Sequence, residues 1–336
     1  YKSEGELKNR LELIGEQITS FQTETRQAYT LLISFGVYPV EDRTMPLRDM
    51  YNRAAVAKSR VKGRYDEIVS FYRPDWQKTL EEEDFMERHM QQAFKKGQMH
   101  FLLEPIVGLA DGKTSAAIAR AEWHIPDRKE PLKMEQFLPV FRKNGFIFQF
   151  DRFLFESACQ TLAGWQKAGT PLLPLVVNLS NELFYDAHFV QRLEQKAALY
   201  GVEPRWLVVE LTETSQTDFL PQLERAGQEL RKAGFGLTVR YAWKGVTLAN
   251  IFQHLPVEGI KVASGIWSPQ ADEKQRAMAQ AMVAICRQLN IFLAADDVKT
   301  PEEQAHIKQL GFQYAAGAAE APLQTPDELA KHVAQS

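Results

Sequence analysis

The sequence has few cysteines, no clear charge excess and no long apolar run, and each absence excludes a class of protein. The only cysteines, Cys159 and Cys286, stand in apolar helical patterns, so we expect buried thiols in a reducing cytoplasm. The net charge of -3 argues against a nucleic-acid-binding surface, which needs a basic excess. No apolar run reaches the roughly 18 residues that a membrane-spanning helix requires.

The start of the chain carries no signal-peptide pattern. A first residue other than Met, here Tyr1, predicts a fragment, with any membrane anchor or sensor region lying upstream. We therefore expect a cytoplasmic location, with the cytoplasmic part of a membrane-anchored sensor as the alternative.

Several catalytic signatures are also missing from the sequence. The seven histidines show no H-E-x-x-H or H-x-H spacing, so we expect surface positions rather than metal ligation. There is no G-x-S-x-G elbow and no P-loop. These absences argue against a histidine-ligated metalloenzyme, a serine hydrolase and a P-loop nucleotidase.

The pattern along the chain predicts two unequal parts joined by a helix. Residues 1–75 read as helix, strand, helix and strand, which is too little for an independent core of normal size and is typical of half an α/β domain. Residues 76–98 follow a proline and carry charge at helical spacing, which predicts a linker helix. The remainder, residues 99–336, is predicted to form the main domain.

In this main domain, apolar strand-like runs alternate with amphipathic helical patterns. Runs without strict alternation suit parallel strands that are covered on both faces. Eight such βα units in about 235 residues predict a TIM-like (β/α)8 barrel. A doubly wound open sheet is the alternative, although no G-x-G-x-x-G follows the first strand.

Polar residues stand near the expected carboxyl ends of the strands, where barrel enzymes carry their chemistry. The set includes amide and carboxylate oxygens that could hold Mg²⁺ or Mn²⁺, and lysine and arginine that could contact a phosphate. Ion pairs closing the mouth of the barrel explain the same composition, and both interpretations stay open at this point. The residues are Arg120, Glu122, Asn178, Glu210, Glu213, Arg240, Lys261, Asp296 and Asp297.

Five motifs resemble a known family when taken in their order and spacing. They are LEPIVGLADGK, VVNLS, VVELTET, HLPVEGIKV and AADDVKTPEEQAHIKQLGF, and together they resemble the EAL domain of bacterial cyclic-di-GMP phosphodiesterases. The resemblance extends from His100 to about Gln335. Upstream, the stretch over 31–72 resembles the tail of a GGDEF (diguanylate cyclase) domain, whose signature hairpin is not in this chain, so we expect no cyclase activity.

The EAL resemblance implies a barrel that hydrolyses one phosphodiester bond of cyclic di-GMP with two divalent cations and an activated water. Carried over by residue, two family ligands and the catalytic lysine are present, as Asn178, Glu210 and Lys261. Asp296 replaces a ligand glutamate. The other family positions are changed, at Ile118, Arg120, Glu122, Arg240, Tyr241, Ala263 and Ala316.

These replacements predict the loss of catalysis. A cation such as Arg240 at a dinuclear site repels metal by several kcal/mol, even at an effective dielectric of about 20. The retained Asn178, Glu210 and Asp296 could hold one weakly bound metal ion at most, so we expect no Mg²⁺ or Mn²⁺ cofactor and treat Lys261 as vestigial. The sequence specifically predicts Arg120 or Arg240 within ion-pair distance of Glu210 or Glu122.

The function expected from this pattern is that of an inactive regulatory module in cyclic-di-GMP signalling. It would act through an unidentified protein partner, with no nucleic acid involved. A non-hydrolysing cyclic-di-GMP receptor is the first alternative, although Arg120 and Glu122 change the side of the strand that faces the nucleotide in the family. An active Mg²⁺- or Mn²⁺-dependent phosphodiesterase is the second. A homodimer is a further alternative, although the segment through which the family often dimerises reads YAWKGVTLAN here and is heavily altered.

Overall fold

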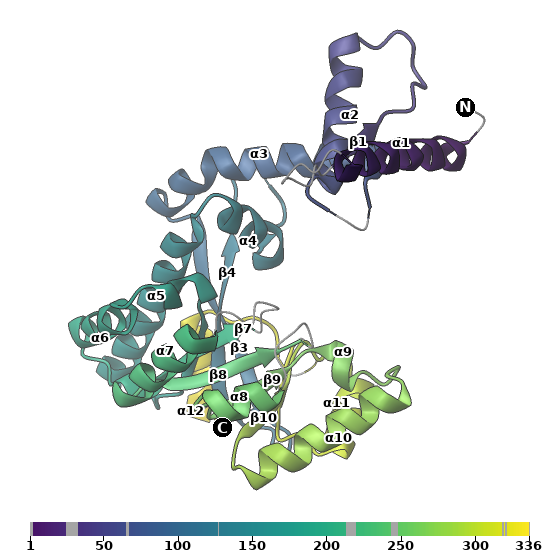
Figure 1. The fold of residues 1–336 in the computed structure, drawn as a ribbon. Coiled ribbons are helices and arrows are strands. Elements are labelled where there is room, and N and C mark those ends of the chain that lie inside the picture. The colour runs from purple at the N-terminus through teal and green to yellow at the C-terminus, as the bar shows by residue number, and fades with distance from the viewer. Residues whose placement is uncertain are drawn as a thin grey trace. The chain divides into compact units, whose positions relative to one another are not determined.

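The computed structural model describes residues 3–24, 33–64, 67–126, 128–212, 220–242, 248–317, 319 and 321–335. The chain divides into two compact units, residues 1–90 and 91–336. The division falls inside helix α3 (Pro74–Lys95), which includes most of the predicted linker helix. Figure 1 shows both units along the chain. Within the described ranges, no helix is both long and apolar enough to cross a membrane.

The first unit has the predicted order of helix, strand, helix and strand. Its elements are α1 (Glu4–Glu24), β1 (Phe35–Val37), α2 (Leu47–Val61) and β2 (Val69–Phe71). The two short strands pair in parallel, which matches the α/β character expected from the sequence. Gly36 allows α2 to lie directly on β1, because a Cβ there would come within 2.0 Å of the Ala54 carbonyl oxygen.

The second unit is a closed eight-stranded barrel, as predicted, which excludes the doubly wound open sheet (Figure 1). The order around the barrel is β3, β11, β10, β9, β8, β7, β6 and β4, and the pairing of β3 with β4 closes it. The strands are β3 (Met99–Gly108), β4 (Thr114–Trp123), β6 (Leu175–Asn178), β7 (Leu207–Thr212), β8 (Gly236–Tyr241), β9 (Gly259–Val262), β10 (Phe292–Ala295) and β11 (Tyr314–Ala316).

One strand departs from the all-parallel expectation. Strand β3 runs antiparallel to both of its neighbours, β4 and β11, while the other barrel pairs are parallel. The reason is local, since only residues 109–113 connect β3 to β4, and a turn of that length can join only antiparallel strands. The first predicted βα unit is therefore a β-hairpin. A two-residue strand, β5 (Leu132–Lys133), adds to β4 beyond the barrel.

Helices cover the outside of the barrel, with α5, α6 and α7 on one side and α9, α10 and α11 on the other in Figure 1. Outward-facing strand residues such as Ala117, Leu207 and Ala315 are fully buried beneath this layer. The helical elements are α4 (Met134–Lys143), α5 (Ile147–Ala168), η1 (Asn181–Tyr185), α6 (Phe189–Tyr200), η2 (Pro204–Trp206), α7 (Leu220–Lys232), α8 (Leu248–His254), α9 (Ser264–Trp267), α10 (Glu273–Gln288), α11 (Pro301–Leu310) and α12 (Pro326–Gln335).

Candidate functional site

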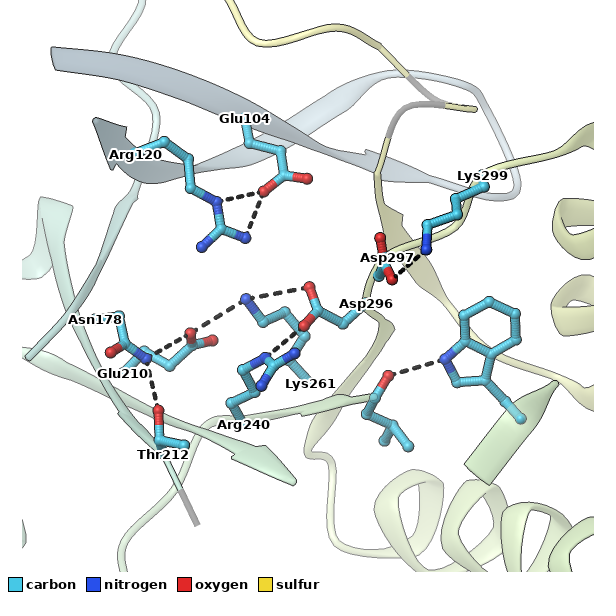
Figure 2. Close-up of polar contacts among 12 residues, drawn as sticks. Glu104, Arg120, Asn178, Glu210, Thr212, Arg240, Lys261, Asp296, Asp297 and Lys299 are labelled. Atoms are coloured by element: carbon cyan, nitrogen blue, oxygen red, sulfur yellow. Dashed lines mark hydrogen bonds and ion pairs between the residues drawn. The ribbon is translucent and has the colours of Figure 1, made fainter. Parts of the chain in front are cut away.

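The carboxyl ends of the parallel strands bring five of the predicted site residues together (Figure 2). The strand register places these residues at the same height in the barrel. Asn178 on β6 is paired with Glu210 on β7, and Arg240 on β8 is paired with Lys261 on β9. Asp296 follows the last residue of β10, and its backbone N–H donates to the Val262 carbonyl of β9. The strand register therefore brings these five residues, which the sequence predicted as site residues, into one cluster at the mouth of the barrel.

Lys261 lies at the centre of this cluster, between two buried carboxylates. Its Nζ is 3.1 Å from Glu210 Oε1 and 3.4 Å from Asp296 Oδ1. The three residues are only 1–3% exposed, so their charges are held away from solvent. The ammonium lies at ion-pair distance from both acids without the alignment of a hydrogen bond. Its position neutralises charge on both carboxylates at once.

Arg240 is the second cation of the cluster. Its Nε donates to Asp296 Oδ2 at 2.5 Å, so each oxygen of Asp296 faces a different protein cation. Burial acts to raise the pKa of Asp296, but Lys261, Arg240 and Arg120 outweigh it and hold that pKa below its ordinary value. The Asp296 carboxylate is thereby kept ionised by side chains of the protein itself.

Arg120 is the third cation, and its partner is Glu104 of β3. The Glu104 carboxylate accepts from Arg120 Nε at 2.6 Å and lies 2.5 Å from Nη2. Burial acts to lower the pKa of the guanidinium, whereas Glu104, Asp296 and Glu210 raise it above its ordinary value. Three cations thus face three carboxylates across the barrel mouth, as Figure 2 shows.

The predicted pairing of these cations had the wrong partners. Arg120 and Arg240 were expected beside Glu210 or Glu122, but they pair with Glu104 and Asp296. Glu104 was missed by the sequence interpretation. A usable signal existed, because a lone acid in the apolar run HFLLEPIVGL is costly to bury unless a cation accompanies it.

The other retained ligand of the family pattern, Asn178, is also occupied by protein contacts. Its Nδ2 donates to Glu210 Oε1 at 3.1 Å and to Thr212 Oγ1 at 3.0 Å. Glu210 Oε1 therefore receives both the Asn178 amide and the Lys261 ammonium. The amide acts in this cluster as a hydrogen-bond donor that fixes Glu210.

Several predicted positions lie away from the charge cluster. Ile118 packs in an apolar group with Val176 and Ala316. Glu122 pairs with His124, whose Nε2 is 3.3 Å away, near the end of β4. Asp297 pairs with the exposed Lys299.

Two of the remaining positions are uncharged and described by the structure. Tyr241 is buried at the end of β8, and Ala263 directly precedes α9. Glu213 lies outside the described residues, as does part of the altered segment over 241–250.

The donor set at the mouth does not fit a pair of divalent cations. Such a site needs carboxylate oxygens directed at the metals, whereas Lys261 and Arg240 already lie against both oxygens of Asp296. In the described part of the chain, no group of three or more His, Cys, Asp or Glu side chains is placed to hold a metal ion. The arrangement is that of an internally neutralised ion network.

Comparison with known proteins identifies the barrel. The family model of the EAL domain matches residues 87–322. The chain belongs to the EAL domain family. Two curated relatives from Pseudomonas aeruginosa are the cyclic di-GMP phosphodiesterase NbdA, 26% identical over 67% of the chain, and the bifunctional diguanylate cyclase/cyclic di-GMP phosphodiesterase MucR, 24% identical over 85%. The chain spans only 29% and 41% of the lengths of these two relatives.

Solved structures of EAL domains share the fold of this EAL-family chain. The MucR phosphodiesterase in complex with cyclic di-GMP matches with a TM-score of 0.67 and 24% identity, over 73% of this chain and 99% of that one. The FimX EAL domain of P. aeruginosa bound to cyclic di-GMP matches with a TM-score of 0.61 and 18% identity, over 71% and 96%. At these identities, the likeness establishes the barrel architecture.

Proposed function

We propose that this EAL domain is a non-hydrolysing regulatory module of cyclic-di-GMP signalling that acts through a protein partner. The observation that carries the proposal is the placement of Lys261 between Glu210 and Asp296, with Arg240 on the second oxygen of Asp296. In two-metal hydrolysis, carboxylates hold the cations that stabilise the attacking and leaving oxygens. In this chain, Lys261 and Arg240 form ion pairs with the carboxylates of Glu210 and Asp296.

The electrostatics of the cluster support this proposal. A metal ion entering beside Asp296 would have to displace the buried Lys261 ammonium or the partly exposed Arg240 guanidinium from that carboxylate. Breaking a buried ion pair costs up to about 3–5 kcal/mol, whereas the loss is smaller for Arg240, which is partly exposed, and is limited for Lys261, which keeps Glu210. The ion network therefore competes directly with metal binding.

Incubation of the purified chain with cyclic di-GMP and Mn²⁺ or Mg²⁺ tests the proposal. We expect no linear product by chromatography and no saturable Mn²⁺ binding by calorimetry. The MucR phosphodiesterase serves as the positive control. Metal-dependent turnover by this chain would overturn the proposal.

Nucleotide binding without hydrolysis is the second candidate function. Two guanidinium groups at the mouth, Arg120 and Arg240, keep 24% and 35% of their side-chain surface exposed, and such groups can contact phosphate. The EAL structures of MucR and FimX were obtained with cyclic di-GMP. Calorimetric titration separates the candidates, because micromolar binding favours a receptor, whereas no heat and no thermal shift favour the protein-interaction module.

The first unit is proposed to be the remnant of a GGDEF domain. Its helix, strand, helix and strand order supports this assignment. So does the MucR match, which covers 286 residues and therefore includes part of the chain before residue 87. A cytoplasmic location and homodimerisation remain proposals, and analytical ultracentrifugation tests the second.

A further inference from the structure

The EAL barrel also contains a cavity at its other end, where the parallel strands begin. This cavity has a volume of about 240 Å³ and extends inward from the rim to Glu210 and Lys261. It lies on the opposite side of these residues from the mouth described above, because it is bounded by Val208, Gly259 and Phe292, which stand at the beginning of β7, β9 and β10. Most of its wall is apolar, with contributions from Ile106, Ala116, Val176, Val208, Ala294 and Tyr314.

The barrel interior at this end is incompletely filled. The inward-facing residues Ile106, Ala116 and Val208 are only partly buried, whereas their outward-facing neighbours Ala117 and Leu207 are fully buried. The interior of a TIM barrel is normally packed with layers of bulky side chains. Here, Ala116 and Ala294 each contribute a single methyl group to the layer, and the space that larger side chains would fill is open.

The rim of the cavity carries one unpaired negative charge. Arg205 and Glu258 both line the rim, but Arg205 forms an ion pair with Glu203, with Nε 2.9 Å from Oε2. Glu258 forms no ion pair with a described residue. Glu258 is exposed at the rim, and a partial loss of water around its carboxyl group raises its pKa, which Arg231 offsets only partly. A cation placed at the rim would therefore give Glu258 the ion-pair partner that no described residue supplies.

We propose that this cavity binds a small aromatic amine, with its ring inside the barrel and its ammonium beside Glu258. The size supports a single ring, since an apolar cavity of about 150 Å³ is enough to bind benzene. The additional volume accommodates the short link between ring and amine. The inner end of the site borders the charge cluster at Glu210 and Lys261, but the ring and the amine bind on the opposite side of these residues from the mouth. Occupation of the site therefore does not depend on the function proposed for that cluster.

Saturation-transfer NMR on the full chain tests this site with three probes of nearly equal size, namely benzylamine, benzyl alcohol and benzoate. We expect benzylamine to bind at least about ten times more tightly than benzoate, with benzyl alcohol between them. Ala294→Phe fills the cavity and should abolish transfer to all three probes. Failure of benzylamine to bind, or binding that Ala294→Phe leaves unchanged, would overturn the proposal.

A second variant keeps the test decisive if Ala294→Phe fails to fold. Glu258→Gln should weaken benzylamine about ten-fold and leave benzyl alcohol unchanged, because only the charge pair is removed. Glu229→Gln, at a partly exposed glutamate of α7 that does not line the cavity, is the matched control and should change neither affinity. Equal losses with both variants, or no loss with Glu258→Gln, would reject the amine specificity.

Discussion

Asp296 at the barrel mouth and Asp151 on helix α5 are equally buried, each only 3% exposed, yet their pKa values are shifted in opposite directions. Burial raises the pKa of Asp151 to about 7, because its hydrogen bond from the Ser180 backbone N–H only partly offsets the loss of water. Burial also acts on Asp296, but three cations reverse the effect. The difference shows that the charge on a buried carboxyl group depends on its neighbours, and that the mouth of this barrel supplies cations from the protein.

Removing Lys261, one of the cations that keep Asp296 different from Asp151, should have the largest effect on the stability of the fold. Lys261→Met leaves Glu210 without its ammonium and removes one of the cations beside Asp296. We expect a loss of about 3–5 kcal/mol in the free energy of unfolding, measured by urea denaturation at neutral pH.

The control for this substitution is Lys299→Met, at the exposed pair with Asp297, which should leave the free energy of unfolding nearly unchanged because solvent screens that pair. Similar losses in the two variants would show that the buried cation has no special role.

The pH dependence of stability should distinguish the two aspartates. Asp151 has a folded pKa of about 7 against an ordinary value of 3.8, so the folded state binds the proton more tightly than the unfolded state does. Stability should then fall as pH rises from about 4 to 7, by up to about 4 kcal/mol. Asp296 has a lowered pKa, so its contribution is present above pH 3.8 and is lost at lower pH.

Asp151→Asn isolates the first of these effects. The amide oxygen can accept the Ser180 N–H without carrying a charge, so the variant should gain stability relative to the parent as pH rises from 5 to 8. Urea denaturation at several pH values measures the difference. A constant offset between variant and parent across this range would contradict the raised pKa.

A smaller effect is expected from Arg240→Ala. Arg240 is 35% exposed and Asp296 retains Lys261 as a partner, so solvent screening and the remaining cation limit the loss. We expect about 1 kcal/mol in urea denaturation. A loss as large as that of Lys261→Met would mean that the two cations are equivalent, and the central position assigned to Lys261 would be wrong.

The sequence predicted much of the barrel and of its mouth. Strand-like runs ending in Asn178, Glu210, Arg240 and Lys261 were enough to expect these side chains at one end of a barrel, because parallel strands align their carboxyl ends. The antiparallel direction of β3 was not expected, although the short connection over 109–113 allows no other pairing. The assignment of Ile118 and Ala263 to lost family ligands stays a prediction.

By itself, the sequence determined which charged and apolar residues stand near each end of the strands, since local periodicity is written in the chain. Only the tertiary structure decided which charges meet. Arg120 on β4 pairs with Glu104 on the neighbouring strand β3 rather than with Glu122 of its own strand, and this choice depends on how the two strands pair and on the side-chain conformations. The existence of the cavity beside Ala116 and Ala294 was likewise decided by the tertiary structure. Whether small residues leave space depends on what the other strands of the closed barrel place opposite them, and that is a property of packing in three dimensions.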